Sequence, residues 1–330
     1  MRISLKNIII PTIPLAVFLV IACCILWISA FFGARFALFP NQTSAIINSI
    51  QTVLVPNTLL SNILSLFFTL INAFLLAQIN NKFTIIRTRT FLPIFIFLLL
   101  MGTWNETHVI NGSHFSLTLF IFALFNFFSM SRNRNASEQA FTGSFLISLS
   151  SILINPLIFI IPVCWIGFMM FQSLSLRTFL ASIFGTFSPW ILYLSVRFLL
   201  TQNFVFTQVF VAVPSVDLST SNYTLPFLIY LGSISLIIII SLIGLYSLTH
   251  NDAIDTRNNL NFLVFLLFSL VVLSILFINQ FVSFLPIIAL IYSMLISHAL
   301  TLKQNNFYGI LFFVFCFINL SYVISKYILL

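Results

Sequence analysis

The sequence predicts an all-α membrane protein, a polytopic bundle of about eleven helices that cross a lipid bilayer. Of its 330 residues, 61% are hydrophobic and only 5% are charged, whereas soluble proteins carry about 25% charged residues. Lipid must therefore surround much of the surface. The apolar runs are continuous, as in residues 225–248 and 261–278, and lack the alternation of membrane-barrel strands. Because a spanning segment must satisfy its backbone polar groups internally, these runs predict helices.

The apolar segments can be placed in order along the chain, since a hydrocarbon core about 30 Å thick requires roughly 20 helical residues. The expected spans are 11–32, 58–78, 91–104, 115–130, 141–155, 156–172, 178–200, 225–248, 260–278, 283–301 and 307–326. The third, fourth and fifth spans are short, so the sequence allows about ten to twelve crossings. No polar region is long enough for a soluble domain, and residues 1–330 are expected to form a single integral membrane domain.

Most prolines lie at or near the start of an expected span, where a missing backbone N–H costs little. Pro93, Pro156, Pro226 and Pro286 have such positions. Pro189 instead falls in the middle of the seventh span, so we expect a kink in that helix.

The distribution of basic residues predicts the orientation. With the N-terminus in the cytoplasm, only Arg35, Arg197 and Lys326 of the 13 Lys and Arg residues fall on the outer side. This asymmetry follows the positive-inside rule, and it would be lost if one helix were added or removed. The basic residues are spread singly between apolar segments and do not form the basic face that nucleic-acid binding requires. We therefore expect membrane lipid, and no nucleic acid, as a partner.

Two outer connections are long enough to hold structure of their own. In residues 33–57, apolar residues recur at helical spacing, which predicts a short helix near 43–55 that lies in the outer interface. Residues 201–224 carry phenylalanines followed by a polar stretch. An active site would have to be built from helix ends and these connections.

The expected spans contain few ionisable residues. None of the 5 Asp and Glu residues has a mid-span position, whereas proton- and sodium-coupled carriers usually bury such a group. Ion-coupled transport is therefore disfavoured, while uncoupled transport and lipid flipping stay compatible with the sequence. The polar groups within the membrane are neutral, such as the amides Asn72, Asn126, Asn155 and Gln280, for which interhelical hydrogen bonds are favoured over a substrate path.

Charged residues on the inner side have simple interpretations. Lys82, Arg87 and Arg89 form the densest basic patch, which would attract anionic lipid headgroups. Asp252 and Asp255 indicate a solvated turn between two helices.

The candidate functional residues gather on the predicted outer face: Arg35, Glu106, His108, His114, Arg197 and Asp217. Glu106 or Asp217 is the candidate catalytic residue, because an outer carboxylate is suited to act as a general base for a sugar hydroxyl. Arg35 or Arg197, near helix ends, is the candidate group for binding a lipid-linked phosphate. The plain alternative is that all of these residues are solvated loop residues.

The connection from Trp104 to His114 also has the residue types of a metal site, with Glu106, His108 and His114. Their spacing matches no metal-binding motif. The sequence therefore predicts no metal centre, and no cofactor is expected.

Several stretches are distinctive when taken together: Ile71–Phe74, Asn80–Phe83, Arg89–Pro93, the small-residue helix from Gly143 to Pro156, and Leu176-Arg177 followed by Gly185 and Pro189. In this order they resemble an uncharacterised bacterial family of multi-pass membrane proteins, a domain of unknown function. The resemblance covers most of the chain and implies an inner-membrane location in a bacterium. It implies no activity.

The architecture also resembles the membrane-embedded glycosyltransferases that use polyprenyl-phosphate sugars. The shared features are the inner N-terminus, the interfacial helix in the first outer connection and the number of spans. Those enzymes usually carry an acidic residue in the first outer connection, whereas the only ionisable residue in 33–57 here is Arg35. Glu106 or Asp217 would have to replace it.

Three functions are compatible with these observations. The first is an inner-membrane protein of unassigned activity that serves the cell envelope by handling lipid-linked or glycan material. The second is a polyprenyl-phosphate-dependent glycosyltransferase that acts on the outer face. The third is an uncoupled transporter or flippase.

Overall fold

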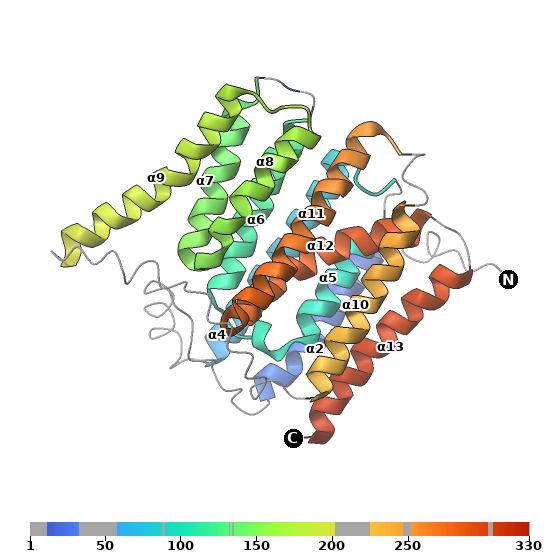
Figure 1. Ribbon diagram of the computed structural model, residues 1–330. Helices are drawn as coiled ribbons and strands as arrows, with labels where there is room; N and C mark the ends of the chain where they lie inside the picture. The colour runs from blue at the N-terminus through green and yellow to red at the C-terminus, as the bar shows by residue number, and fades with distance from the viewer. Residues whose placement is uncertain are drawn as a thin grey trace.

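The computed structural model consists of helices and their connections (Figure 1). It describes residues 12–32, 58–87, 90–131, 133, 135–201, 225–246, 252–302 and 306–329. These residues contain α-helices and short 3-10 helices and no strand, so the predicted all-α fold is confirmed. The expected interfacial helix near 43–55 lies outside the described residues and stays a prediction.

Each described α-helix overlaps one of the expected spans. The helices are α2 (Ile13–Phe32), α4 (Thr58–Phe83), α5 (Leu92–Thr103), α6 (Gly112–Ser129), α7 (Ser137–Leu153), α8 (Ile161–Met170), α9 (Leu176–Thr201), α10 (Leu225–Tyr246), α11 (Ile254–Leu276), α12 (Phe281–Leu302) and α13 (Asn306–Leu329). Short 3-10 helices cover Asn105–Thr107, Asn155–Ile160 and Ile278–Gln280. The helix α12 begins before the expected span, so Pro286 lies inside it and not at its start.

Among the described residues, 7 helices are long and apolar enough to cross a membrane, namely α4, α6, α9, α10, α11, α12 and α13. Many large apolar side chains of α9, α10 and α13 point away from the protein, including Phe184, Ile243 and Phe317. A continuous apolar surface of this kind is unfavourable in water and expected in lipid. The chain is therefore a helical membrane protein.

The central helix of the bundle is α12 (Figure 1). It packs against α5, α10 and α11, and almost all of its surface is buried. At one edge, α13 packs on α10 and α5. Towards the opposite edge, α6 packs on α7, and α7 packs on α9. The edge helices α9 and α13 thus lie on opposite sides of the bundle and expose apolar faces.

Small residues let α7 and α9 approach closely. A Cβ atom at Gly185 would collide with the carbonyl oxygen of Phe141, so only glycine fits this contact. Pro189 lies inside α9, as expected, and has no N–H to donate to the Gly185 carbonyl. The Ser188 hydroxyl donates to that carbonyl instead, at 3.2 Å. The indole of Trp190 donates to Ser151 of α7 at 3.0 Å, which adds a polar link between the two helices.

The polar contacts join helix ends that the sequence assigned to the same side of the membrane. We call the end that carries the α4–α5 connection the inner end, and the end that carries the α5–α6 connection the outer end, following the predicted orientation. At the inner end, Arg87 contacts Asp252, which precedes α11. At the outer end, Lys326 of α13 contacts Thr103 of α5. Both contacts are those expected if each described helix crosses the membrane in the direction opposite to that of the helix before it.

Candidate functional site

The α5–α6 connection is a compact turn whose polar side chains bond within it. Asn111 caps α6, because its side-chain oxygen accepts from the Ser113 amide at 3.1 Å. The same oxygen lies 2.9 Å from Nδ1 of His114, and Nε2 of His114 lies 3.0 Å from the carbonyl oxygen of Thr107. His114 is fully buried and joins the two ends of the connection.

His108 is buried in the same connection. Its Nε2 lies 3.2 Å from the carbonyl oxygen of Gly102, and its ring packs on Trp27 of α2 with 4.2 Å between ring centroids. Burial disfavours the charged imidazolium and lowers the pKa of His108 from 6.5 to about 3. The interpretation of His108 and His114 as solvated loop residues is therefore wrong, since both hold the turn together.

The two histidines of this connection bond to backbone carbonyls. No group of three potential metal ligands occurs among the residues that the structure describes. Both histidines have a ring nitrogen within hydrogen-bond distance of a backbone carbonyl. Such histidines act as structural side chains that satisfy the backbone of the turn.

Glu106 lies in the 3-10 helix Asn105–Thr107 and faces the last turns of α13. Its carboxylate interacts electrostatically with Lys326 and with Tyr322. One carboxylate oxygen, Oε2, is buried and has no hydrogen-bond partner in the described part of the chain. A desolvated carboxylate oxygen without a donor is costly.

The cation beside Glu106 is Lys326. Its Nζ atom donates to the carbonyl oxygen of Thr103 at 2.8 Å and lies 4.5 Å from the ring centroid of Tyr322. The sequence assigned Lys326 only to topology. Asn319, Tyr322 and Lys326 share one face of α13, since they are three and then four residues apart. That spacing of polar residues along one face of α13 is the sequence signal that the prediction missed.

Tyrosines complete this group of residues. The rings of Tyr230 and Tyr322 stack with 4.1 Å between centroids, and the Tyr230 hydroxyl donates to Oδ1 of Asn319 at 2.8 Å. Thr103 donates to the same oxygen at 3.2 Å. We call the set Thr103, Glu106, Tyr230, Asn319, Tyr322 and Lys326 the outer cluster. It lies between α5, α10 and α13.

The predicted phosphate-binding and catalytic residues do not all meet there. Arg197 lies near the end of α9, which packs mainly against α7 at the edge of the bundle opposite α13 (Figure 1). It is therefore not brought to Glu106. Arg35 and Asp217 lie outside the described residues, so their proposed roles stay predictions.

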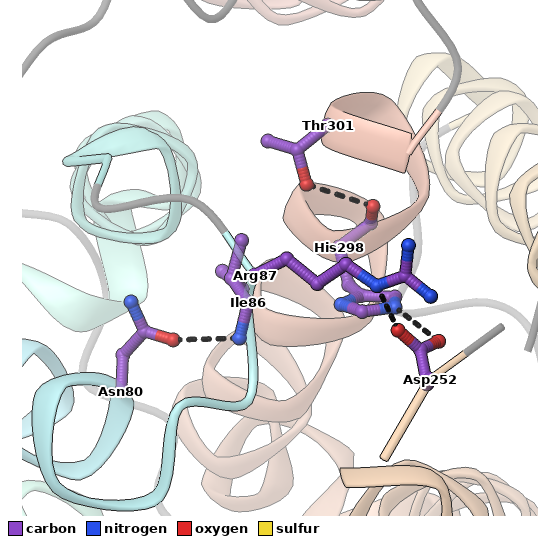
Figure 2. Close-up of polar contacts among 6 residues, drawn as sticks. All are labelled: Asn80, Ile86, Arg87, Asp252, His298 and Thr301. Atoms are coloured by element: carbon purple, nitrogen blue, oxygen red, sulfur yellow. Dashed lines mark hydrogen bonds and ion pairs between the residues drawn. The ribbon is translucent and has the colours of Figure 1, made fainter.

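A second polar group at the inner end was not predicted. Nε of Arg87 donates to Oδ1 of Asp252, and Nε2 of His298 on α12 lies 3.3 Å from Oδ2 of the same carboxylate (Figure 2). The side chains of Asp252 and His298 are fully buried, whereas that of Arg87 is 41% exposed. We call these three residues the inner cluster. The interpretation of Asp252 as part of a solvated turn is wrong.

Local hydrogen bonds position the inner cluster. Oδ1 of Asn80, near the end of α4, accepts from the Ile86 amide at 3.0 Å and fixes the segment that carries Arg87 (Figure 2). Asp255, in the first turn of α11, accepts from the Ser131 hydroxyl at 2.8 Å. The start of α11 is thus bound both to the α4–α5 connection and to the end of α6.

Two of the neutral amides within the membrane form the expected interhelical bonds. The Thr118 hydroxyl donates to Asn72 at 2.8 Å and joins α6 to α4. The Thr142 hydroxyl donates to Asn126 at 2.9 Å and joins α7 to α6. The interhelical interpretation is confirmed for these two amides.

No protein-family model, curated protein or solved structure matches the chain.

Proposed function

We propose that this membrane protein serves a bacterial cell envelope by binding a lipid-linked phosphate at the outer cluster. The observation that carries the proposal is the position of Lys326, which donates to the Thr103 carbonyl at the outer end of α5 and interacts electrostatically with Glu106 in the connection that follows. These residues come from distant parts of a chain that has few charges. Ionisable groups near the membrane are costly and usually mark a functional site.

The chemistry of the outer cluster suits a phosphate that carries a sugar or another hydroxyl group. The ammonium of Lys326 is a compact cation that binds phosphate as a point charge. Oε2 of Glu106 is a buried acceptor without a donor in the described residues, so it suits a ligand hydroxyl. Lys326 thus takes the role that the sequence suggested for Arg35 or Arg197.

The position of the cluster suits a lipid ligand. It lies against α10 and α13 at an edge of the bundle (Figure 1). Both helices expose large apolar side chains to the membrane, such as Ile229 of α10 and Phe317 of α13. A polyprenyl chain could therefore lie along these helices while its phosphate reaches Lys326.

The binding proposal is tested with the purified full-length protein in detergent. Native mass spectrometry would compare a polyprenyl phosphate with the polyprenol of the same length. We expect the phosphate to bind at least about tenfold more tightly, since one charge-assisted contact contributes roughly 1.5–3 kcal/mol. Lys326→Gln should abolish that preference, whereas Lys82→Gln, which removes a cation at the inner end, should leave it unchanged. Equal binding of both lipids would refute the proposal.

Glycosyl transfer is the second candidate function, favoured by the buried Oε2 of Glu106. In that case Glu106 would accept the proton of an attacking sugar hydroxyl. Glu106→Gln should then retain binding of the polyprenyl phosphate and lose turnover of a polyprenyl-phosphate sugar. Turnover that persists in Glu106→Gln would exclude Glu106 as the base, and a wild-type protein without turnover would leave binding without catalysis as the function.

A further inference from the structure

The inner cluster plays no part in the proposed function, and it contains a buried charged group. Asp252 has a fully buried carboxylate, and each of its oxygens has a different partner, Arg87 at Oδ1 and His298 at Oδ2. Removing a carboxylate from water is costly unless it is paired. The cluster is thus held together by charge, at the junction of α11, α12 and the α4–α5 connection.

The protonation of His298 can be assigned atom by atom. Because Nε2 faces a carboxylate oxygen, this nitrogen carries a hydrogen in either charge state. A further proton must therefore bind to Nδ1. That atom is buried and has no hydrogen-bond partner within the described residues. The backbone carbonyl of Ile85 is an acceptor beside the same ring.

The three side chains differ in their access to water. With a neutral His298, the charges of Arg87 and Asp252 cancel. A proton on His298 leaves the cluster with one excess positive charge at a buried position. Asp252 and His298 cannot reach water, whereas Arg87 is 41% exposed. The excess charge is therefore relieved most easily if Arg87 leaves for solvent, because the imidazolium then compensates the carboxylate.

We propose that Asp252 and His298 form a proton-binding site, and that a proton at Nδ1 of His298 releases Arg87 from Asp252. Arg87 belongs to the α4–α5 connection and Asp252 to the start of α11. Proton binding at the inner end therefore breaks the ion pair that joins the α4–α5 connection to the start of α11.

Other charged groups around His298 do not replace these partners. At the inner end, the further charged residues described on neighbouring elements are Lys82 on α4 and Asp255 and Arg257 on α11, while Lys326 lies at the other end of α13. Nζ of Lys82 lies over aromatic rings, and Asp255 accepts from Ser131. No described hydrogen bond or ion pair joins Lys82 or Arg257 to Asp252 or His298.

The test measures how much Arg87→Gln lowers the apparent melting temperature at two pH values. The apparent melting temperature of the full chain in detergent would be recorded at pH 8 and pH 5, the range in which histidine commonly titrates. At pH 8, Arg87→Gln leaves Asp252 without its cation and should lower the melting temperature by at least about 2 °C. At pH 5, the imidazolium of His298 replaces the guanidinium, so the same substitution should cost little.

The control variant is His298→Gln, whose side-chain amide still donates to Asp252 and cannot take a proton. In this background Arg87→Gln should lower the melting temperature by the same amount at both pH values. Lys82→Gln, on the neighbouring helix end, should change the melting temperature equally at pH 8 and pH 5. If His298→Gln does not fold, His298→Asn replaces it. A cost of Arg87→Gln that is equal at pH 8 and pH 5 in the wild-type background would overturn the proposal, as would a pH dependence that persists without His298.

Discussion

The side chain of Lys326 donates to the carbonyl oxygen of Thr103 at 2.8 Å, across a sequence separation of 223 residues. Thr103 is the last residue of α5, so its carbonyl has no partner within the helix. Lys326 therefore caps α5 and also stands beside Glu106. Lys326 therefore contributes both to the packing of α13 on α5 and to the charge of the outer cluster.

Glu106 and Lys326 should be energetically coupled. A double-mutant cycle with Glu106→Gln and Lys326→Gln should give an interaction of about 0.5–1 kcal/mol at low salt, because both groups are partly shielded from water. The measurement is SDS-induced unfolding of the full chain in mixed micelles. Additive effects would mean that the two charges act independently.

Acid should destabilise the protein through His108. Its pKa in the folded state, about 3, lies below the ordinary value of 6.5, so the folded state binds fewer protons than the unfolded state between these values. The stability contributed by this group is complete above pH 6.5 and decreases as the pH falls towards 3. Between pH 7 and pH 5 the loss should be about 2 kcal/mol.

The variant His108→Gln isolates this effect, because glutamine can still donate to the Gly102 carbonyl but does not titrate. Its unfolding free energy should vary with pH by about 2 kcal/mol less than that of the wild type over the same interval. An identical pH dependence in both proteins would show that His108 is not buried as described.

Asn80 should act by positioning Arg87. Asn80→Ala removes the hydrogen bond to the Ile86 amide and should cost about 1 kcal/mol of unfolding free energy. In the Arg87→Gln background the cost should be smaller, since both residues fix the same segment. Asn133→Ala, which removes an exposed bond to the Asn135 amide, serves as the matched control and should have little effect.

Close packing of α7 and α9 should depend on Gly185. Gly185→Leu would force the side chain against the backbone of Phe141. It should lower the free energy of unfolding, measured by SDS-induced unfolding, by about 1–3 kcal/mol. Gly232→Leu on α10 is the control, because no atom lies within 4 Å of a Cβ placed there. The control should be neutral or slightly stabilising, since glycine is a poor helix former. Equal losses in both variants would contradict the described contact.

The helices were predictable because lipid imposes a simple rule on sequence. Continuous apolar runs predicted all of the described helices. Boundaries were less accurate where polar residues extend a helix beyond the apolar run. The helix α11 begins at Ile254 and not near residue 260, because Asp255 and its neighbours are already helical at the inner end.

The sites were less predictable because they depend on contacts between distant residues. Arg87 and Asp252 are 165 residues apart, and nothing local to Asp252 distinguishes a solvated turn from a buried ion pair. Glu106 was predicted as an outer carboxylate near a helix end and stays a prediction, whereas its electrostatic partner Lys326 follows only from the packing of α13 on α5. Burial of His108 likewise results from the position of Trp27 on α2.

The central claim is that a lipid-linked phosphate binds at the outer cluster. The most direct test is photocrosslinking of the full chain with a polyprenyl phosphate that carries a photoreactive group next to the phosphate, followed by peptide mapping. The account predicts crosslinks to the last turns of α13 and to the α5–α6 connection, which disappear when unlabelled polyprenyl phosphate is in excess. Crosslinks confined to the inner end, around Lys82 and Arg87, or crosslinks that excess unlabelled lipid does not reduce, would contradict it.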